Sequence, residues 1–247
     1  MLEEIAPDAA DVRVVRGRAS QLDADRTGTD AMLVSTAETG VPTVRVWAPH
    51  RHVAFGRRDA RAEGYERART AAESHGYPPV ERSVGGRAVA YSGTTLAFAV
   101  AVPTDDSRRG LEARYDAATT AVVRALRSLG VPARRGEPEA SFCPGDHSVQ
   151  ARGKISGIAQ RIRRETALVA GVVVVDAHEE LASVLAPVYE ALDVPFDPDS
   201  VGSVARSGGP ADPDAAAESL RDTLCGDLGR RTVSVSALLA EYGEGHR

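Results

Sequence analysis

Lysine is almost absent from this sequence, because only one of its 30 basic residues, Lys154, is not an arginine. Lys154 lies in the glycine-flanked stretch Gly153-Lys154-Ile155-Ser156-Gly157. Arginine presents a broad planar group, whereas lysine carries a compact ammonium on a thin stem that reaches into a narrow pocket. The single exception therefore marks position 154 as a candidate functional site, the alternative being an accidental lysine on a solvated loop.

Cysteine and long apolar runs are also scarce. The two cysteines, Cys143 and Cys225, lie far apart and form no CxxC pair, so the sequence predicts free thiols and no metal site. The longest uncharged apolar run, 167–175, is too short to cross a bilayer, and the acidic N-terminus has no apolar segment of signal-peptide length. We therefore expect a cytoplasmic protein with no membrane partner.

The chain also lacks a basic block. Its net charge is −5, which argues against nucleic acid as a partner. With 247 residues, 43% of them hydrophobic, it can bury a full core. The segment 195–213 is rich in Pro, Gly, Ser and Asp and predicts a long, flexible surface loop, after which too few residues follow to form a second core. We predict a single domain spanning residues 1–247.

Segments with helix and strand periodicity alternate along the chain, which favours a mixed α/β fold. We expect strands at 43–47, 52–56, 95–102, 155–162 and 167–175, and helices at 61–74, 111–129 and 215–224. In the strand at 95–102 the large apolar residues point one way, and Ala97, Ala99 and Ala101 point the other. Both faces of this strand should be buried, and the alanine face leaves room for a helix or an alkyl chain.

A glycine pair, Gly85 and Gly86, lies between Arg82 and Arg87 in the first of two motifs. Paired glycines let the backbone approach a ligand closely and turn its N–H groups towards it, and the arginines add positive charge. The pattern is also typical of a hairpin turn with charged shoulders.

Cys143 opens the second motif, in which Pro144-Gly145 predicts a chain reversal that brings Lys154 back within one hairpin's reach. Positive charge favours the thiolate, so a thiol beside an ammonium is an activated nucleophile. His147 is a candidate general base, although a solvated loop histidine fits the pattern too. Cys225 lies in a helical stretch and fits an inert core residue.

Together these residues resemble the lipoate and octanoate protein ligases and transferases, whose fold is shared with biotin protein ligases. The stretch Arg82 to Val89 resembles the family's Arg-x-x-Gly-Gly-x-Ala-Val acyl-binding loop, and Gly153 to Ala159 its Gly-Lys-x-x-Gly-x-Ala motif. Arg45-Val46-Trp47 and the following residues 53–57 are similar to its first strand pair. The resemblance implies a central mixed, largely antiparallel sheet flanked by helices.

The resemblance also implies a set of site residues. Cys143 and Lys154 would be catalytic, with Lys154 holding the acyl oxygen, and no metal ligands are implied. The residues implied in acyl binding come from both motifs: Arg82, Gly85, Gly86, Arg87, Ala88, Ser156, Gly157 and Ala159.

Two chemistries occur in this family. Its ligases activate lipoate with ATP and usually carry Arg-Asn-Asp before the lysine, whereas here the segment reads Phe142-Cys143-Pro144-Gly145-Asp146, similar to the cysteine-dependent octanoyl amidotransferases. Arg87 in place of a third glycine is also transferase-like. The resemblance therefore implies a transferase that needs no cofactor.

Such a transferase moves an octanoyl or lipoyl group through a cysteine thioester onto lipoyl-carrier proteins, such as the glycine cleavage H-type protein and the lipoyl domains of 2-oxoacid dehydrogenases. The first alternative is a lipoate-protein ligase that uses ATP and Mg and acts through lipoyl-AMP, with Asp146 as its aspartate. The second alternative is a non-catalytic module that binds acyl carriers.

Overall fold

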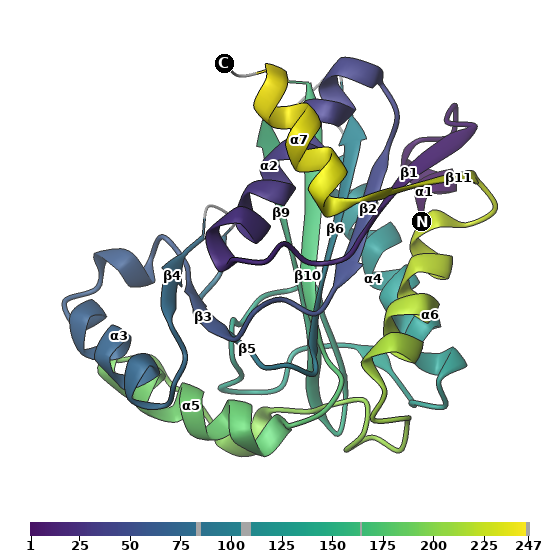
Figure 1. The fold of residues 1–247 in the computed structure, drawn as a ribbon. Helices are drawn as coiled ribbons and strands as arrows, with labels where there is room; N and C mark the ends of the chain where they lie inside the picture. Colours follow the sequence, from purple (N-terminus) through teal and green to yellow (C-terminus); the bar gives the residue numbers. More distant parts are fainter. Residues whose placement is uncertain (83–84, 105–109, 164, 246–247) are drawn as a thin grey trace.

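The computed structural model describes residues 1–82, 85–104, 110–163 and 165–245, and within them the strands form two sheets (Figure 1). The order of the larger sheet is β11-β1-β2-β6-β10-β9-β8-β7, and that of the smaller one is β4-β3-β5. The larger sheet contains β1 (Asp11–Arg16), β2 (Thr43–Trp47), β6 (Thr95–Pro103), β7 (Arg134–Arg135), β8 (Ser148–Ala151), β9 (Gly153–Arg163), β10 (Thr166–Val174) and β11 (Gly229–Ser234). The smaller contains β3 (His52–Phe55), β4 (Pro79–Glu81) and β5 (Val89–Tyr91).

Strand directions in the larger sheet are mixed. β1 runs parallel to both of its neighbours, β2 and β11, and the other neighbouring strands, from β2–β6 to β7–β8, pair antiparallel. The expected mixed, largely antiparallel sheet is confirmed, as are the five strands that periodicity predicts. The β-branched run in β10 lies between β6 and β9, at the centre of the sheet.

Helices cover both faces of the larger sheet and one side of the smaller sheet (Figure 1). One face packs against α1 (Leu2–Ile5), α4 (Leu111–Ser128) and α6 (Pro213–Cys225), and the other against α2 (Leu22–Thr39) and α7 (Val235–Gly245). The smaller sheet packs against α3 (Tyr65–Ser74) and α5 (His178–Ala191). Two short 3-10 turns span Asp59–Arg61 and Pro198–Ser200. No helix in the described ranges is both long enough and apolar enough to span a bilayer.

The two faces of β6 differ as its sequence predicts. Leu96, Phe98 and the valines that alternate with the alanines are buried in the core beneath α4 and α6. On the opposite face Ala101 is buried in the core that includes Met32 of α2, while Ala97 and Ala99 line a cavity. The helix foreseen for the alanine face is therefore present beside Ala101, and the alkyl chain foreseen as the other occupant stays a prediction for the open space beside Ala97 and Ala99.

The helix predicted at 61–74 is shorter than expected, because it begins at Tyr65. The residues before it form the 3-10 turn Asp59–Arg61, and Gly64 precedes the helix. A Cβ at Gly64 would clash with the carbonyl of Ala191 at the end of α5, so this position accepts only glycine. A close approach of two helices, which periodicity does not report, decides where α3 begins.

The prediction of a surface loop at 195–213 is wrong for the middle of that segment. Val201, Ser203 and Val204 are fully buried. The amide of Gly202 donates to the carbonyl of Lys154 at 2.9 Å, and a Cβ on Gly202 would lie 2.6 Å from the carbonyl of Gly153. The segment is irregular, but it packs against the strand that carries Lys154, since its glycines and serines permit close contact.

Candidate active site

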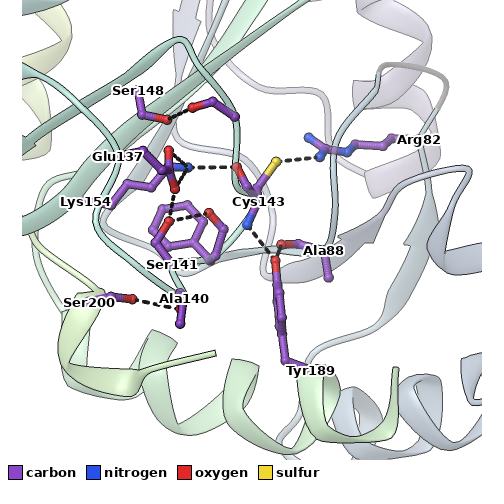
Figure 2. Close-up of polar contacts among 12 residues, drawn as sticks. Arg82, Ala88, Glu137, Ala140, Ser141, Cys143, Ser148, Lys154, Tyr189 and Ser200 are labelled. Carbon is purple, nitrogen blue, oxygen red and sulfur yellow. Dashed lines mark hydrogen bonds and ion pairs between the residues drawn. The ribbon is translucent and has the colours of Figure 1, made fainter. Parts of the chain in front are cut away.

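Cys143 lies in a turn with a left-handed backbone, at φ 45°, which is uncommon for a residue other than glycine. Its amide donates to the phenol oxygen of Tyr189 at 2.6 Å, and the Tyr189 hydroxyl donates to the carbonyl of Ala88 at 2.9 Å (Figure 2). Burial raises the pKa of Tyr189 well above its usual value, so the phenol stays protonated. One tyrosine of α5 thereby ties the cysteine turn to the end of the glycine loop.

Lys154 is fully buried at the start of β9, and all of its ammonium protons have acceptors. Its Nζ donates to the two carboxylate oxygens of Glu137, at 3.0 and 2.9 Å, and to the carbonyl of Cys143 at 2.7 Å. Burial lowers the pKa of the Lys154 ammonium, and the Glu137 carboxylate opposes that change. The predicted proximity of Lys154 to Cys143 is present, but the lysine meets the backbone carbonyl of the cysteine.

Arg82 is the cation in contact with the thiol. Its Nη2 donates to the Sγ of Cys143 at 3.2 Å and to the carbonyl of Arg87 at 2.6 Å. In Figure 2 the sulfur points towards Arg82, and Lys154 lies on the other side of the cysteine. The glycine loop, and not the lysine motif, therefore supplies the positive charge next to the sulfur.

The glycine loop passes close to both groups at Gly86, whose φ of 101° lies in the region that favours glycine. A Cβ there would lie 2.5 Å from the Sγ of Cys143 and 2.6 Å from the Nη2 of Arg82. Arg87 points elsewhere and forms a 3.0 Å ion pair with the fully buried Asp59. Arg87 thus anchors the loop instead of lining the cavity. The motif residues Ser83 and Val84 lie outside the described residues.

An open cavity of about 740 Å³ adjoins these groups. Cys143, Arg82, Gly85 and Gly86 line it, and so do residues of α2 and of the cysteine turn. Its floor consists of two rows across β9, β10 and β6, which are Gly157–Val172–Ala97 and Ala159–Ala170–Ala99. Most of the side chains in these rows are methyl groups or hydrogen, which leaves space for an unbranched apolar chain.

Trp47 of β2 pairs with Ala97 and stands at the end of the first row. Its indole Nε1 donates to Asp25 at 2.9 Å, and the guanidinium of Arg45 lies 4.0 Å from its ring centroid. Arg45 and Asp25 are both buried and form an ion pair. The indole is therefore held firmly, and it closes the floor at this end.

The other predicted site residues are divided between cavity and core. Gly157 and Ala159 line the cavity, whereas Ser156 is fully buried, with an Oγ that has no partner in the described structure. His147 lines the cavity and stacks on Tyr115 at 3.6 Å between ring centroids. Within the described ranges no hydrogen bond joins His147 to Cys143, so its role as general base stays a prediction.

His52 is a buried ring at the cavity wall, stacked on Tyr91 at 4.7 Å. Burial lowers the pKa of His52 from 6.5 to about 4. Between these values the unfolded chain binds a proton that the folded protein does not, so this contribution to stability is complete above about pH 6.5 and is lost as the pH falls towards 4. From pH 7 to 5 the His52 contribution should fall by roughly 2 kcal/mol.

Urea unfolding at pH 7 and pH 5 tests this prediction. His52→Gln should show a smaller loss of unfolding free energy than the wild type, and His75→Gln, at an exposed histidine that ends α3, should show the wild-type loss. Equal losses in both variants would mean that His52 does not contribute to the acid sensitivity.

Sequence reasoning missed Glu137, Asp59 and Tyr189. Glu137 lies in an irregular segment and Asp59 in the short 3-10 turn Asp59–Arg61, and in neither does periodicity mark a side chain as buried or paired. Tyr189 lies among the apolar residues of α5, and a tyrosine in such a helix signals a phenol that needs a polar partner. Only that last signal was available, and it does not name the partner.

The family model of the lipoyl protein ligase A/B catalytic domain matches residues 26–217. Octanoyl-GcvH protein N-octanoyltransferase of Bacillus velezensis is 29% identical over 134 residues, and that of Lysinibacillus sphaericus 27% over 125. These matches cover 53% and 50% of this chain and 47% and 45% of the relatives, so the chain spans about half the length of the curated relatives that it matches.

Two solved structures share the fold. A crystal structure of lipoate-protein ligase A bound with ATP superposes with a TM-score of 0.74 at 21% identity, covering 95% of this chain and 94% of that one. A bi-partite lipoate protein ligase studied with its E2 lipoyl domain, from Thermoplasma acidophilum, gives 0.69 at 19% identity, covering 96% and 92%. At these identities the likeness concerns the fold alone.

Proposed function

The chain belongs to the lipoyl protein ligase A/B catalytic domain family, and on that premise we propose that it is an enzyme that moves an octanoyl or lipoyl group onto the lysine of a lipoyl-carrier protein through a thioester on Cys143. One observation carries the proposal: a free thiol with a guanidinium donating to it at 3.2 Å lines a cavity whose floor is made of small side chains. A cysteine next to a fixed cation is a nucleophile, and the cavity beside it accepts an alkyl chain.

The reaction has two halves. In the first, the Sγ of Cys143 forms a bond to the acyl carbonyl carbon, the bond from that carbon to the donor lysine nitrogen breaks, and the departing amine takes up a proton. In the second, the acceptor lysine amine forms its bond to the same carbon, the carbon–sulfur bond breaks, and the amine loses a proton. The protons balance over the cycle, and His147 is our candidate for moving them.

The proposed partners follow from the names of the relatives. The Bacillus and Lysinibacillus proteins are named for transfer from GcvH, the H protein of glycine cleavage, and the Thermoplasma ligase was studied with its E2 lipoyl domain. We propose the same classes of carrier here, namely the H-type protein as donor and the lipoyl domains of 2-oxoacid dehydrogenases as acceptors.

An ATP-dependent lipoate-protein ligase is the second candidate, and Asp146 favours it, because this carboxylate lines the cavity beside Cys143. In that reaction ATP and Mg would activate free lipoate as lipoyl-AMP. Incubation of the protein with an octanoylated H-type carrier and an unmodified lipoyl domain tests the choice. Acylation of the acceptor without ATP supports the transferase, whereas acylation that requires ATP and free lipoate supports the ligase.

The cavity floor should set the length of the acyl chain. Ala99→Leu places about three more carbon atoms on that floor, so the preferred acyl group should become shorter by a similar number of carbons. Competition among carriers that bear acyl chains of different lengths measures the preference. Ala101→Val, on the same face of β6 but beneath α2, should change stability and leave the preference alone. An unchanged preference in a folded Ala99→Leu protein would place the acyl chain elsewhere.

A further inference from the structure

The two cations near Cys143 differ in whether their charge is already neutralised. Lys154 faces the carboxylate of Glu137, and its remaining proton bonds the Cys143 carbonyl, so the pair is close to neutral as a whole. To reach an acyl oxygen or the sulfur, the lysine would have to give up one of these three hydrogen bonds. A buried pair of this kind holds backbone in place more readily than it activates a thiol.

Arg82 has no such partner. Within the part of the chain that the structure describes, no carboxylate forms an ion pair with Arg82, and its other acceptor is the neutral carbonyl of Arg87. Its Nε is buried and has no hydrogen-bond partner among the described residues, which costs free energy. Burial alone would lower the pKa of the Arg82 guanidinium, but the Cys143 sulfur and the phenols of Tyr91 and Tyr189 together outweigh burial and raise it. The Cys143 sulfur, 3.2 Å from this guanidinium, is therefore the atom best placed to carry the negative charge that balances it.

The backbone is built to permit this contact. Gly86 lies where a Cβ would displace both the sulfur and the guanidinium, and Gly86 in turn packs tightly against Gly56. Gly86 thus has a second purpose besides lining the cavity. It lets the guanidinium and the sulfur meet at 3.2 Å.

We propose that Arg82 is the catalytic cation of this site, which stabilises negative charge on the Cys143 sulfur as it attacks and leaves the acyl group, and that Lys154 and Glu137 form a positioning pair that fixes the cysteine turn through its carbonyl. The thiol gives its proton to solvent before the sulfur forms its bond to the acyl carbon, and in the second half of the reaction the sulfur leaves as a thiolate beside Arg82. This inference rests on the proposed thioester function for its catalytic meaning, but the state of the sulfur can be measured without any acyl substrate.

The test is the rate at which iodoacetamide alkylates Cys143. It is measured in a Cys225→Ala background, so that Cys143 is the only cysteine that can react. At pH 7 the rate in Arg82→Gln should fall about fivefold, because fewer molecules carry a thiolate, and Arg82→Lys should recover most of it. At pH 10, where thiols ionise without help, Arg82→Gln should react as fast as the wild type or faster, since a thiolate released from a cation is more nucleophilic. A merely distorted site would stay slow at both pH values.

Lys154→Met is the comparison. Loss of the positioning pair should change the rate by a similar factor at pH 7 and at pH 10, because the lysine does not set the charge of the sulfur. The double variant Glu137→Gln/Lys154→Met, which removes both charges together, gives the same comparison if the single variant does not fold. The inference is overturned if removal of the lysine slows alkylation at pH 7 but not at pH 10 while Arg82→Gln leaves the rate unchanged. If alkylation follows Arg82 as expected but the wild type transfers no acyl group, the proposed function fails and the assignment of Arg82 to the sulfur stands.

Discussion

Replacing Cys143 by alanine should abolish acyl transfer, with a loss of at least about 1,000-fold in turnover, because the thioester route has no other nucleophile to form its intermediate. The substitution removes one partly exposed sulfur and leaves the backbone hydrogen bonds of the turn, to Tyr189 and Lys154, intact. Turnover with an octanoylated H-type carrier and an unmodified lipoyl domain is the measurement, and thermal unfolding should show a stable protein.

Cys225→Ala is the matched control. Cys225 is fully buried in the core at the end of α6 and does not line the cavity. Its loss should therefore lower stability by about 1 kcal/mol and leave turnover intact. Full-rate acylation by Cys143→Ala once ATP, magnesium and free lipoate are added would contradict the thioester mechanism and favour the ligase.

Lys154→Arg should also lose activity, by about 100-fold or more, although it keeps the positive charge. The lysine is completely enclosed, and its ammonium fits among Glu137, the Cys143 carbonyl and the backbone of Gly157, whose Cβ position lies 3.4 Å from the lysine Cε. A guanidinium is wider and must push the cysteine turn aside. The steady-state rate with the two carriers is the readout.

An exposed neighbouring residue provides the control for this exchange. Arg152→Lys exchanges the same two residue types two positions away, at the surface, and should leave turnover unchanged. Near wild-type turnover in a folded Lys154→Arg protein would mean that lysine is not retained at this position for its shape.

Much of the site could be predicted from the sequence because several of its residues are of types or in patterns that are uncommon in this chain. The only lysine, the cysteine on a Pro-Gly turn and the glycine pair all stand out in a chain that is otherwise rich in arginine and alanine. Strand periodicity predicted β6 and β10, indicated that both faces of β6 are buried, and singled out the alanine face, part of which lines the cavity. These features are local, so single-sequence patterns report them.

The partner of each charge could not be predicted, because it depends on how distant segments pack. Spacing brings Lys154 back to Cys143 but does not say whether it meets the sulfur or the carbonyl, and Glu137, which decides this, lies in a segment without periodicity. Arg82 reaches the sulfur from a loop 61 residues earlier in the chain. The buried middle of the 195–213 segment was missed for the same reason, since its small polar residues suit a solvated loop and a tightly packed one equally.

The mass of the protein itself after incubation with an octanoylated H-type carrier, without ATP and without an acceptor, is the most direct measurement. The thioester mechanism predicts an increase equal to one octanoyl group, located on Cys143, removed by neutral hydroxylamine and transferred when an unmodified lipoyl domain is added. An unmodified mass under these conditions, together with acylation of the acceptor only when ATP and a free acid are supplied, would contradict it.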